Sequence, residues 1–353
     1  MSGTTSVLVA SGVRHARDYV EILRQVPTVR LIGIAEESTA PEWATGDSAE
    51  LAETCGLTLV EMSEGLAAAD AAVVCSEPSR HAAIARQALR AGCHVLIDKP
   101  AAVNSAEFEL LALEAAAAPA QVVTSIHRLL SPAIVRARRI IDSGAIGLPL
   151  SVDLEWIASG GLDGSTVERP ELVCDPVLSG GGELTNFGWY PILALHHLTG
   201  LEVVDIAGFG GALFGGPHAD FGVEDTAVLS IGLEHGVTST VTVSRAAVGV
   251  GSEPVSSTGV VLGSHGHLVL DESRPDAAIR TLGSPTTTHR RILESAGAAA
   301  LDACFNDFIG AVRGNVQVAL QLADIGRAVQ ILDAAREAIA SGSVVRLKGP
   351  SDQ

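Results

Sequence analysis

The chain of 353 residues is poor in several residue types, and each shortage excludes a class of protein. Charged residues make up only 18% of the sequence, yet no uninterrupted apolar run reaches the roughly 18 residues that a membrane span requires. The five cysteines are odd in number and never stand in Cys-x-x-Cys spacing, so neither a disulfide framework nor a zinc site is expected, and we predict no metal. They are interpreted as small buried apolar residues.

Basic residues are also scarce, because 23 Lys and Arg face 41 Asp and Glu and leave a net charge of −18. Such a surface repels nucleic acid and anionic lipid. We therefore expect a small-molecule substrate as the partner, and we expect neither nucleic acid nor membrane. The first residues carry neither the basic flank nor the small-residue cleavage site of a secretory signal, and we expect a cytoplasmic protein. The length favours two domains.

The first 125 residues alternate short apolar runs with longer helical stretches, which is typical of βαβ units and a parallel sheet. The apolar run Ala71–Cys75 fits a strand buried on both faces, and His81–Ala91 and Ser105–Ala117 are predicted helices. We therefore predict an α/β domain, a doubly wound Rossmann fold, over residues 1–125. Its other strands are expected at Ser6–Ala10, Val29–Ala35, Cys93–Ile97 and Gln121–Ser125.

Apolar and polar residues alternate from about Leu150, as in Val152–Trp156, and predict a sheet with one solvent-facing side. Two such runs, Leu229–Leu233 and Val237–Val243, flank a hairpin turn. Residues 126–353 are predicted to form an α+β domain for substrate binding and oligomerisation, with a large, open, mostly antiparallel sheet. Strands at Val260–Leu262 and His267–Leu270, helices at Leu301–Ile309 and Ala323–Ala340, and loops at 160–165, 210–217 and 249–258 complete the prediction.

A turn after the first predicted strand has the place, and part of the composition, of a dinucleotide-binding loop. Of the three glycines that let backbone approach a pyrophosphate, only Gly12 is present, with Ala10 and His15 near the other positions. Glu36 follows Gly12 by 24 residues, close to the spacing of the acid that binds the adenosine ribose. This carboxylate favours NAD, and NADP stays open because Arg14 could neutralise a 2′-phosphate. The predicted cofactor-binding residues here are Ser11, Gly12, Val13, Arg14 and Glu36.

The most specific motifs lie between Ala71 and Pro100. The run Ala71–His81 ends in Ser-Glu-Pro-Ser-Arg-His, and Ala88–Pro100 reads Ala-Leu-Arg-Ala-Gly-Cys-His-Val-Leu-Ile-Asp-Lys-Pro. This ordered set closely resembles the Gfo/Idh/MocA oxidoreductase family, in which the last motif is Glu-Lys-Pro. The similarity continues through Gly180–Pro191 and covers most of the chain.

The resemblance implies an NAD(P)-dependent dehydrogenase or reductase acting on CH–OH groups of a sugar, cyclitol or related compound. The family's catalytic lysine falls on Lys99 and its proton carrier on Tyr190, as in the branch that includes dihydrodiol, xylose and glucose–fructose oxidoreductases. Asn186 stands where the family has an acid, and we expect it to position substrate. The further cofactor-binding residues implied are Ser76, Glu77, Pro78, His81, Asp98 and Lys99 itself.

Several side chains are candidates for binding substrate. His127 and Arg128 are expected to line the crevice between the domains, Trp156 to offer a flat apolar wall, and His197 to contact substrate, with ordinary packing as the alternative for each. Hydride transfer from an alcohol also requires a proton acceptor. The pKa of Tyr190 would have to fall from about 10 to near 7, which costs about 4 kcal/mol. One cation about 4 Å away supplies about that much, so Lys99 is expected to lower this pKa.

Two other functions stay open. The depleted glycine turn and Asn186 also fit a catalytically silent relative that senses a nucleotide or small molecule and regulates a partner. Redox-neutral chemistry on a tightly held cofactor, in which the hydride is borrowed and returned, is the other. In each case the apolar alternation near 228–243 and 260–270 predicts a homodimer or homotetramer.

Overall fold

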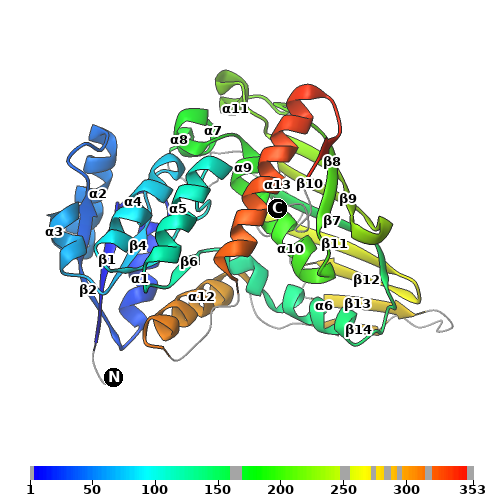
Figure 1. The fold of residues 1–353 in the computed structure, drawn as a ribbon, viewed down its shortest axis with the longest axis horizontal. Helices are drawn as coiled ribbons and strands as arrows, with labels where there is room; N and C mark the ends of the chain where they lie inside the picture. Colours follow the sequence, from blue (N-terminus) through cyan, green and yellow to red (C-terminus); the bar gives the residue numbers. More distant parts are fainter. Residues whose placement is uncertain are drawn as a thin grey trace.

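The computed structural model describes residues 4–159, 169–246, 255–271, 276–281, 288–291, 296–314 and 320–347. It contains two sheets side by side, with helices between and around them (Figure 1). The first sheet consists of the parallel strands β1 (Thr5–Ala10), β2 (Val29–Glu36), β3 (Leu59–Glu61), β4 (Ala71–Val74), β5 (His94–Ile97) and β6 (Val122–Thr124).

The strand order of this sheet is β3-β2-β1-β4-β5-β6. A dinucleotide-binding fold has this order, and its ligand crevice opens at the carboxyl ends of the strands where the order reverses, between β1 and β4. Every residue of these two strands is buried, because helices cover both faces of the sheet. The helices of this domain are α1 (Ala16–Gln25), α2 (Glu42–Cys55), α3 (Met62–Ala67), α4 (Pro78–Arg90) and α5 (Ser105–Ala117).

One core lies under α3, α4 and α5 and continues into the second domain, and the other lies under α1 and α2. The second core also contains Phe305 and Phe308 from α12 (Ala296–Val312). The chain thus returns from the second domain to cover the first sheet. The long C-terminal helix α13 (Leu322–Ser341) then packs against both α5 and the second sheet.

The second sheet has the order β14-β13-β12-β11-β7-β10-β9-β8-β15. Its neighbours are antiparallel except for β10 and β7, which run parallel. The strands are β7 (Pro149–Ser159), β8 (Val203–Gly211), β9 (Thr226–Leu233), β10 (Thr238–Ala246), β11 (Val255–Gly263), β12 (Gly266–Asp271), β13 (Asp276–Thr281), β14 (Thr288–Arg291) and β15 (Val345–Arg346).

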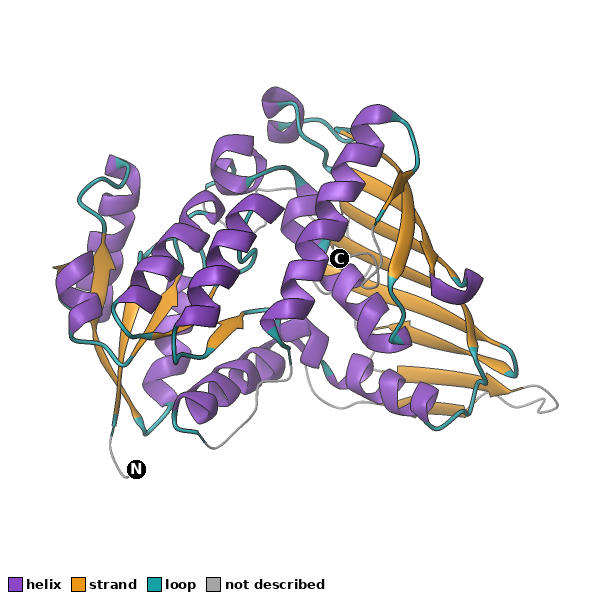
Figure 2. Cartoon of the chain, viewed as in Figure 1, coloured by secondary structure: helices purple, strands orange, loops and turns teal. Residues whose placement is uncertain are grey.

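Helices cover the side of this sheet that faces the first domain (Figures 1 and 2). Along β7, Val152, Leu154 and Trp156 are buried on that side, while Glu155 is exposed on the other. The alternation read from the sequence is therefore the alternation between the two faces. The remaining elements are η1 (His127–Leu130), α6 (Pro132–Asp142), α7 (Glu171–Cys174), α8 (Pro176–Ser179), α9 (Glu183–Phe187), α10 (Trp189–Thr199), α11 (Pro217–Phe221) and η2 (Glu234–Gly236).

The predicted fold class and the predicted strands and helices are confirmed, with corrections at three places. The expected loop 249–258 is wrong from Val255, where β11 begins and pairs with β7. The expected loop 210–217 is shorter, because β8 extends to Gly211 and α11 begins at Pro217. The strands β3, β8, β13, β14 and β15 were not predicted, and 160–165 lies outside the described residues. No helix in the described ranges has the length and apolar character of a membrane span.

Candidate active site

The turn between β1 and α1 is built without glycine at two strained positions. Ser11 has φ 72° and Arg14 has φ 49°, a region that glycine enters most readily. Gly12 is required for a different reason, because a Cβ there would lie 2.6 Å from the Cα of Ser48 on α2. The Gly12 N–H donates to the Ser48 hydroxyl at 2.8 Å. The turn is thus closed tightly against α2.

Glu36, at the end of β2, lies beside this turn as the sequence predicts. Its buried carboxylate accepts hydrogen bonds from the hydroxyls of Ser11 at 2.6 Å and Ser48 at 2.9 Å. Arg80 Nη1 donates to the same carboxylate at 2.9 Å. The cation beside Glu36 is therefore Arg80, whereas Arg14, which could have neutralised a 2′-phosphate there, points to Asn186.

Arg80 lies among three carboxylates. Besides Glu36 it contacts Glu37 at 3.0 Å and both oxygens of Glu77, at 2.6 and 2.8 Å. Burial opposes its charge, but the hydrogen bonds and charge of Glu77, followed by Glu36, raise the pKa of Arg80 above its ordinary value. Three negative charges against one positive charge make this end of the crevice a poor place for a phosphate.

Asp98, directly after β5, connects the turn to the centre of the cleft. Its buried carboxylate accepts hydrogen bonds from the Tyr19 hydroxyl at 2.8 Å and the Lys99 backbone N–H at 2.8 Å, and it contacts His15 Nδ1 at 2.7 Å. Burial opposes ionisation, yet the charges of His15 and Arg14 hold the pKa of Asp98 well below its ordinary range. Asp98 is therefore a fixed negative charge that orients the start of the Lys99 segment.

Lys99 extends from this point to the second domain. Its Nζ donates to the backbone oxygen of Asn186 at 2.8 Å and to the side-chain Oδ1 at 2.5 Å, both of which are uncharged. The ammonium also lies 5.4 and 5.9 Å from the ring centroids of Phe187 and Tyr190. Burial, followed by the charge of Arg14, lowers the pKa of Lys99 to about 7. Lys99 can therefore exchange a proton near neutral pH.

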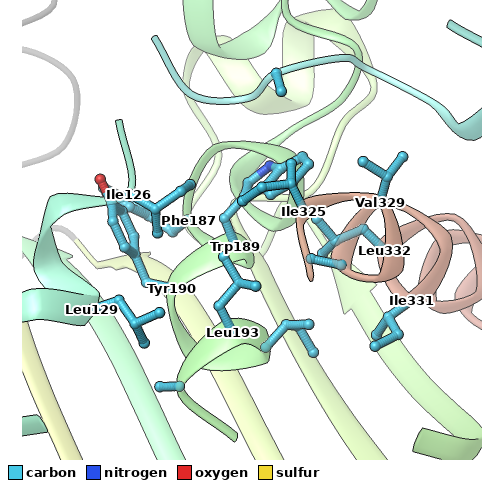
Figure 3. Close-up of a cluster of buried hydrophobic side chains, with 14 of the residues drawn as sticks. Ile126, Leu129, Phe187, Trp189, Tyr190, Leu193, Ile325, Val329, Ile331 and Leu332 are labelled. Carbon is cyan, nitrogen blue, oxygen red and sulfur yellow. The ribbon is translucent and has the colours of Figure 1, made fainter. Parts of the chain in front are cut away.

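Tyr190 lies beside Lys99 as predicted, but its ionisation is not eased. Burial raises the pKa of Tyr190 well above its ordinary value, against the opposing charge of Arg128. The expected lowering by Lys99 is wrong in this structure, because the ammonium faces the ring and the loss of water around the phenol outweighs it. Figure 3 shows Tyr190 beside Ile126 and Leu129, whereas Trp189 points to the other side of the helix.

Asn186 and Tyr190 occupy successive helical turns, because Gly188 between α9 and α10 keeps helical dihedral angles. Sequence reasoning overlooked Glu183, which lies three residues before Asn186 and is fully buried. The Glu183 carboxylate accepts from Asn186 Nδ2 at 2.9 Å and Arg245 Nε at 2.5 Å, and lies 3.0 Å from His218 Nε2. Since Nδ2 is held by Glu183, the amide oxygen must face Lys99. A carboxylate directly after three glycines was the available signal.

The predicted substrate residues fall into two groups. Trp156 stacks on Tyr190 with 5.7 Å between ring centroids and 12° between planes, and the His127 ring lies 6.2 Å from the same ring. Trp156 Nε1 and His127 Nδ1 are buried without a hydrogen-bond partner. Burial, followed by the charge of Arg128, lowers the pKa of His127 to about 3. His197 lies two turns beyond Tyr190, where its backbone oxygen accepts from an arginine of α6 at 2.7 Å, away from this cluster.

The remaining predicted cofactor residues form the turns around the crevice. The ring nitrogens of His81 lie 2.7 Å from the backbone oxygens of Ser76 and Pro100, so His81 ties two turns together. Pro78 begins α4, and Val13 packs against Leu172 of α7. Among the described residues, no group of three or more His, Cys, Asp or Glu is placed to hold a metal ion.

Family models match both halves of the chain. A model described as an oxidoreductase family with an NAD-binding Rossmann fold matches residues 7–126, and a model of the GFO/IDH/MocA C-terminal domain matches residues 134–269. The uncharacterized oxidoreductase YrbE of Bacillus subtilis (strain 168) is 25% identical over 266 residues, which cover 74% of this chain and 72% of YrbE.

Solved structures resemble the whole chain. GenD2 from gentamicin A biosynthesis, in complex with NAD, superposes with a TM-score of 0.82 at 23% identity and covers 99% of this chain and 98% of GenD2. Levoglucosan dehydrogenase, in complex with NADH and L-sorbose, gives a TM-score of 0.83 at 19% identity and covers 98% of this chain and 99% of that enzyme. At these identities the likeness establishes the fold.

Proposed function

The chain belongs to the Gfo/Idh/MocA family of oxidoreductases, and from that premise we propose that it transfers a hydride between nicotinamide and a hydroxyl or carbonyl carbon of a sugar, cyclitol or related compound. The observation that supports the proposal best is the pair Lys99 and Tyr190, buried together where the NAD-binding domain meets the second domain. Structural neighbours that act on carbohydrates, levoglucosan dehydrogenase among them, support the substrate class.

The first domain fits a dinucleotide in its topology and in its charges. The turn that holds Gly12 precedes α1 at the point where the strand order reverses, so its backbone and the helix N-terminus suit a pyrophosphate. Glu36 and Glu37 mark the end of the crevice where an adenosine ribose belongs, and their charge favours a ribose without a 2′-phosphate. NAD is therefore the cofactor that we assign.

Nicotinamide, when bound, supplies or accepts the hydride, and the side chains of the protein must manage the proton. Lys99, with its pKa of about 7, can be neutral or charged at physiological pH. Tyr190 keeps its proton there, because its pKa is raised. We assign to the Tyr190 hydroxyl the contact with the substrate oxygen and the passage of the proton, and to Lys99 the storage of that proton.

The residues around Tyr190 suit a ring with several hydroxyls. Trp156 supports the Tyr190 ring and closes one side of the cluster, and its N–H has no partner. His127, whose ring meets the Tyr190 ring edge-on, also has an unpaired ring nitrogen. Buried polar atoms without partners cost free energy, and a hydroxyl-rich ligand or ordered water would supply the missing hydrogen bonds.

The test begins with fluorescence titration of NADH and NADPH, followed by a panel of sugars, cyclitols and their ketones. On the best substrate, Lys99→Ala and Tyr190→Phe should each lower turnover by about 10²- to 10⁴-fold while NADH binding is retained. Lys348→Ala is the matched control, since Lys99 and Lys348 are the two lysines of the chain. Wild-type turnover in both active-site variants would contradict the assigned roles.

The same measurements address the two alternatives. Tight NADH binding without hydride exchange on the whole panel would favour a sensor. Nicotinamide that stays bound through purification and is reduced and reoxidised within one turnover would favour redox-neutral chemistry.

A further inference from the structure

The Arg14 side chain leaves the turn before α1 and runs into the cleft toward the second domain. It is 2% exposed. Its Nη2 lies 3.4 Å from Asn186 Oδ1, the oxygen to which the Lys99 ammonium donates. Two buried cations from separate segments of the first domain therefore converge on one uncharged oxygen of the second domain.

The nearest carboxylate does not complete the hydrogen bonding of Arg14. Asp98 Oδ2 is 4.0 Å from Arg14 Nε, and the carboxylate is already engaged by His15, Tyr19 and the Lys99 backbone. Arg14 Nε is buried and has no hydrogen-bond partner. A guanidinium held out of water with unfilled donors is costly unless an anion completes it.

The other buried carboxylate of the cleft, Glu183, is also occupied. Arg245 Nε lies 2.5 Å from Glu183 Oε1, and His218 Nε2 lies 3.0 Å from the same oxygen. When Lys99 is protonated, what remains around Asn186 is one anion, Asp98, against the two cations Arg14 and Lys99. This surplus of positive charge stands out in a chain whose net charge is −18.

We propose that Arg14 and Lys99 form an anion subsite in the cleft and that the substrate is a carbohydrate acid, with its carboxylate close to the carbon that exchanges the hydride. The proposal rests on the proposed function, because it names the substrate class of the same site. A carboxylate matches the parallel N–H donors of a guanidinium in shape and charge. Since Arg14 and Lys99 reach the same atom, one substrate can offer its carboxylate to Arg14 and its reacting oxygen to the Lys99 side.

The pyrophosphate of the cofactor is an anion of the same charge class and must be distinguished from a substrate carboxylate. The backbone of the turn and the N-terminus of α1 are the elements that suit the pyrophosphate. Arg14 instead reaches across to Asn186, on the side of the cleft that carries Tyr190 and Trp156. This direction favours the substrate.

The experiment uses two pairs of compounds that differ in one carboxylate: D-gluconate with D-glucitol, and D-glucuronate with D-glucose. Binding to the NADH-loaded full chain is measured by calorimetry and by the shift in melting temperature, and NADH affinity by fluorescence. The variants are Arg14→Gln and Arg14→Lys, which keep a Cβ at the strained position. Arg139→Gln is the matched control, because Arg139 is exposed in the last turn of α6.

Wild type and Arg139→Gln should bind at least one acid more tightly than its neutral counterpart. Arg14→Gln should weaken the binding of that acid by about 10- to 100-fold, since a hydrogen bond to a charged group contributes about 1.5–3 kcal/mol. The affinity for the neutral compound should not change. Arg14→Lys should retain part of the preference. NADH affinity should change less than about threefold.

Weakened NADH binding in Arg14→Gln with no preference for acids would overturn the proposal and assign Arg14 to the pyrophosphate. An equal loss of rate on acid and neutral compounds would also overturn it, because Arg14 would then act on the reacting oxygen. Acid binding that depends on Arg14 without hydride transfer on any compound would leave the subsite standing and refute the proposed function alone.

Discussion

Moving the buried carboxylate of the cleft by one helical turn should shift the pKa of Lys99 upward. The variant that does this is Glu183→Gln combined with Asn186→Asp, which keeps the number of charges in the cluster constant. In the native chain Lys99 Nζ donates to an amide oxygen at 2.5 Å, and the carboxylate lies behind that amide. In the double variant the ammonium would meet a carboxylate directly.

The size of the shift follows from the geometry. Unit charges about 4 Å apart at an effective dielectric of about 20 attract by about 4 kcal/mol, which corresponds to about 3 pKa units. Glu183 already raises the pKa of Lys99 from a greater distance, so the net gain is about 2 to 3 units, from about 7 toward 9 or 10. Asn186→Asp alone should give a smaller shift, because repulsion between the new carboxylate and that of Glu183 would keep the pair partly protonated.

Two assays report this pKa. Oxidation of an alcohol needs neutral Lys99, so its rate should rise through pH 7 in the native protein, and at pH 7.5 the double variant should be slower by on the order of 100-fold. Competitive acylation read by mass spectrometry needs no substrate and compares Lys99 with Lys348 in the same sample. An inflection of Lys99 that stays near pH 7 in the double variant by both assays would refute the assignment of Lys99 as the titrating group.

Three further outcomes are expected. Glu36→Ser with Glu37→Ser should move the ratio of the NADH and NADPH dissociation constants toward NADPH by at least about tenfold, since two negative charges are removed and Arg80 Nη1, with Glu77 still held by Nε and Nη2, becomes able to donate to a 2′-phosphate; an unchanged ratio by fluorescence titration would contradict this. Gly12→Ala should lower the free energy of unfolding by about 1–3 kcal/mol because its Cβ would meet α2, whereas Gly46→Ala, which has nothing within 4 Å, should not destabilise in chemical denaturation. Sedimentation velocity should show a dimer or tetramer. The substitution Val228→Asp, on the exposed face of the second sheet, should dissociate it. A native chain that is monomeric at micromolar concentration would contradict the predicted oligomer.

The parallel sheet was predictable because its strands are short apolar runs followed by turn residues, and helices of ordinary length separate them. The strand Leu59–Glu61 was not predicted, because three partly exposed residues are too few to show an alternation of apolar and polar residues. The first part of β11, residues 255–259, was missed for another reason, since its serines and glycine have the composition of a loop and become a strand through pairing with β7. The parallel pairing of β10 with β7 joins segments about 90 residues apart, and local patterning does not encode such a contact.

The site was predictable where one motif contains the chemistry, as in Asp98 and Lys99. Sequence could not give the pKa of Tyr190, because burial decides its direction here and a nearby cation alone would have lowered it. Nor could it give the partners of Glu183, since Arg245 is 62 residues away. A pKa depends on which groups the fold places together, and in this cleft those groups come from both domains.

The departures of this chain from the pattern that it resembles belong together physically. A carboxylate at position 186 would neutralise Lys99 and attract the guanidinium of Arg14, and no unfilled positive charge would remain for a ligand. An amide there leaves both cations short of an anion, and Glu183 makes the amide usable by holding its N–H₂ group away from them. The amide therefore leaves the effects of burial and of Arg14 on the pKa of Lys99 without an adjacent opposing carboxylate, and it leaves Arg14 without an anion. If a carboxylate of the substrate supplies that anion, it arrives with the molecule to be oxidised or reduced, and it would raise the pKa of Lys99 only while the substrate is bound. For an acid substrate, the pKa seen in the pH profile of kcat should then be higher than the pKa seen in the profile of kcat/KM. For its neutral counterpart the two pKa values should coincide.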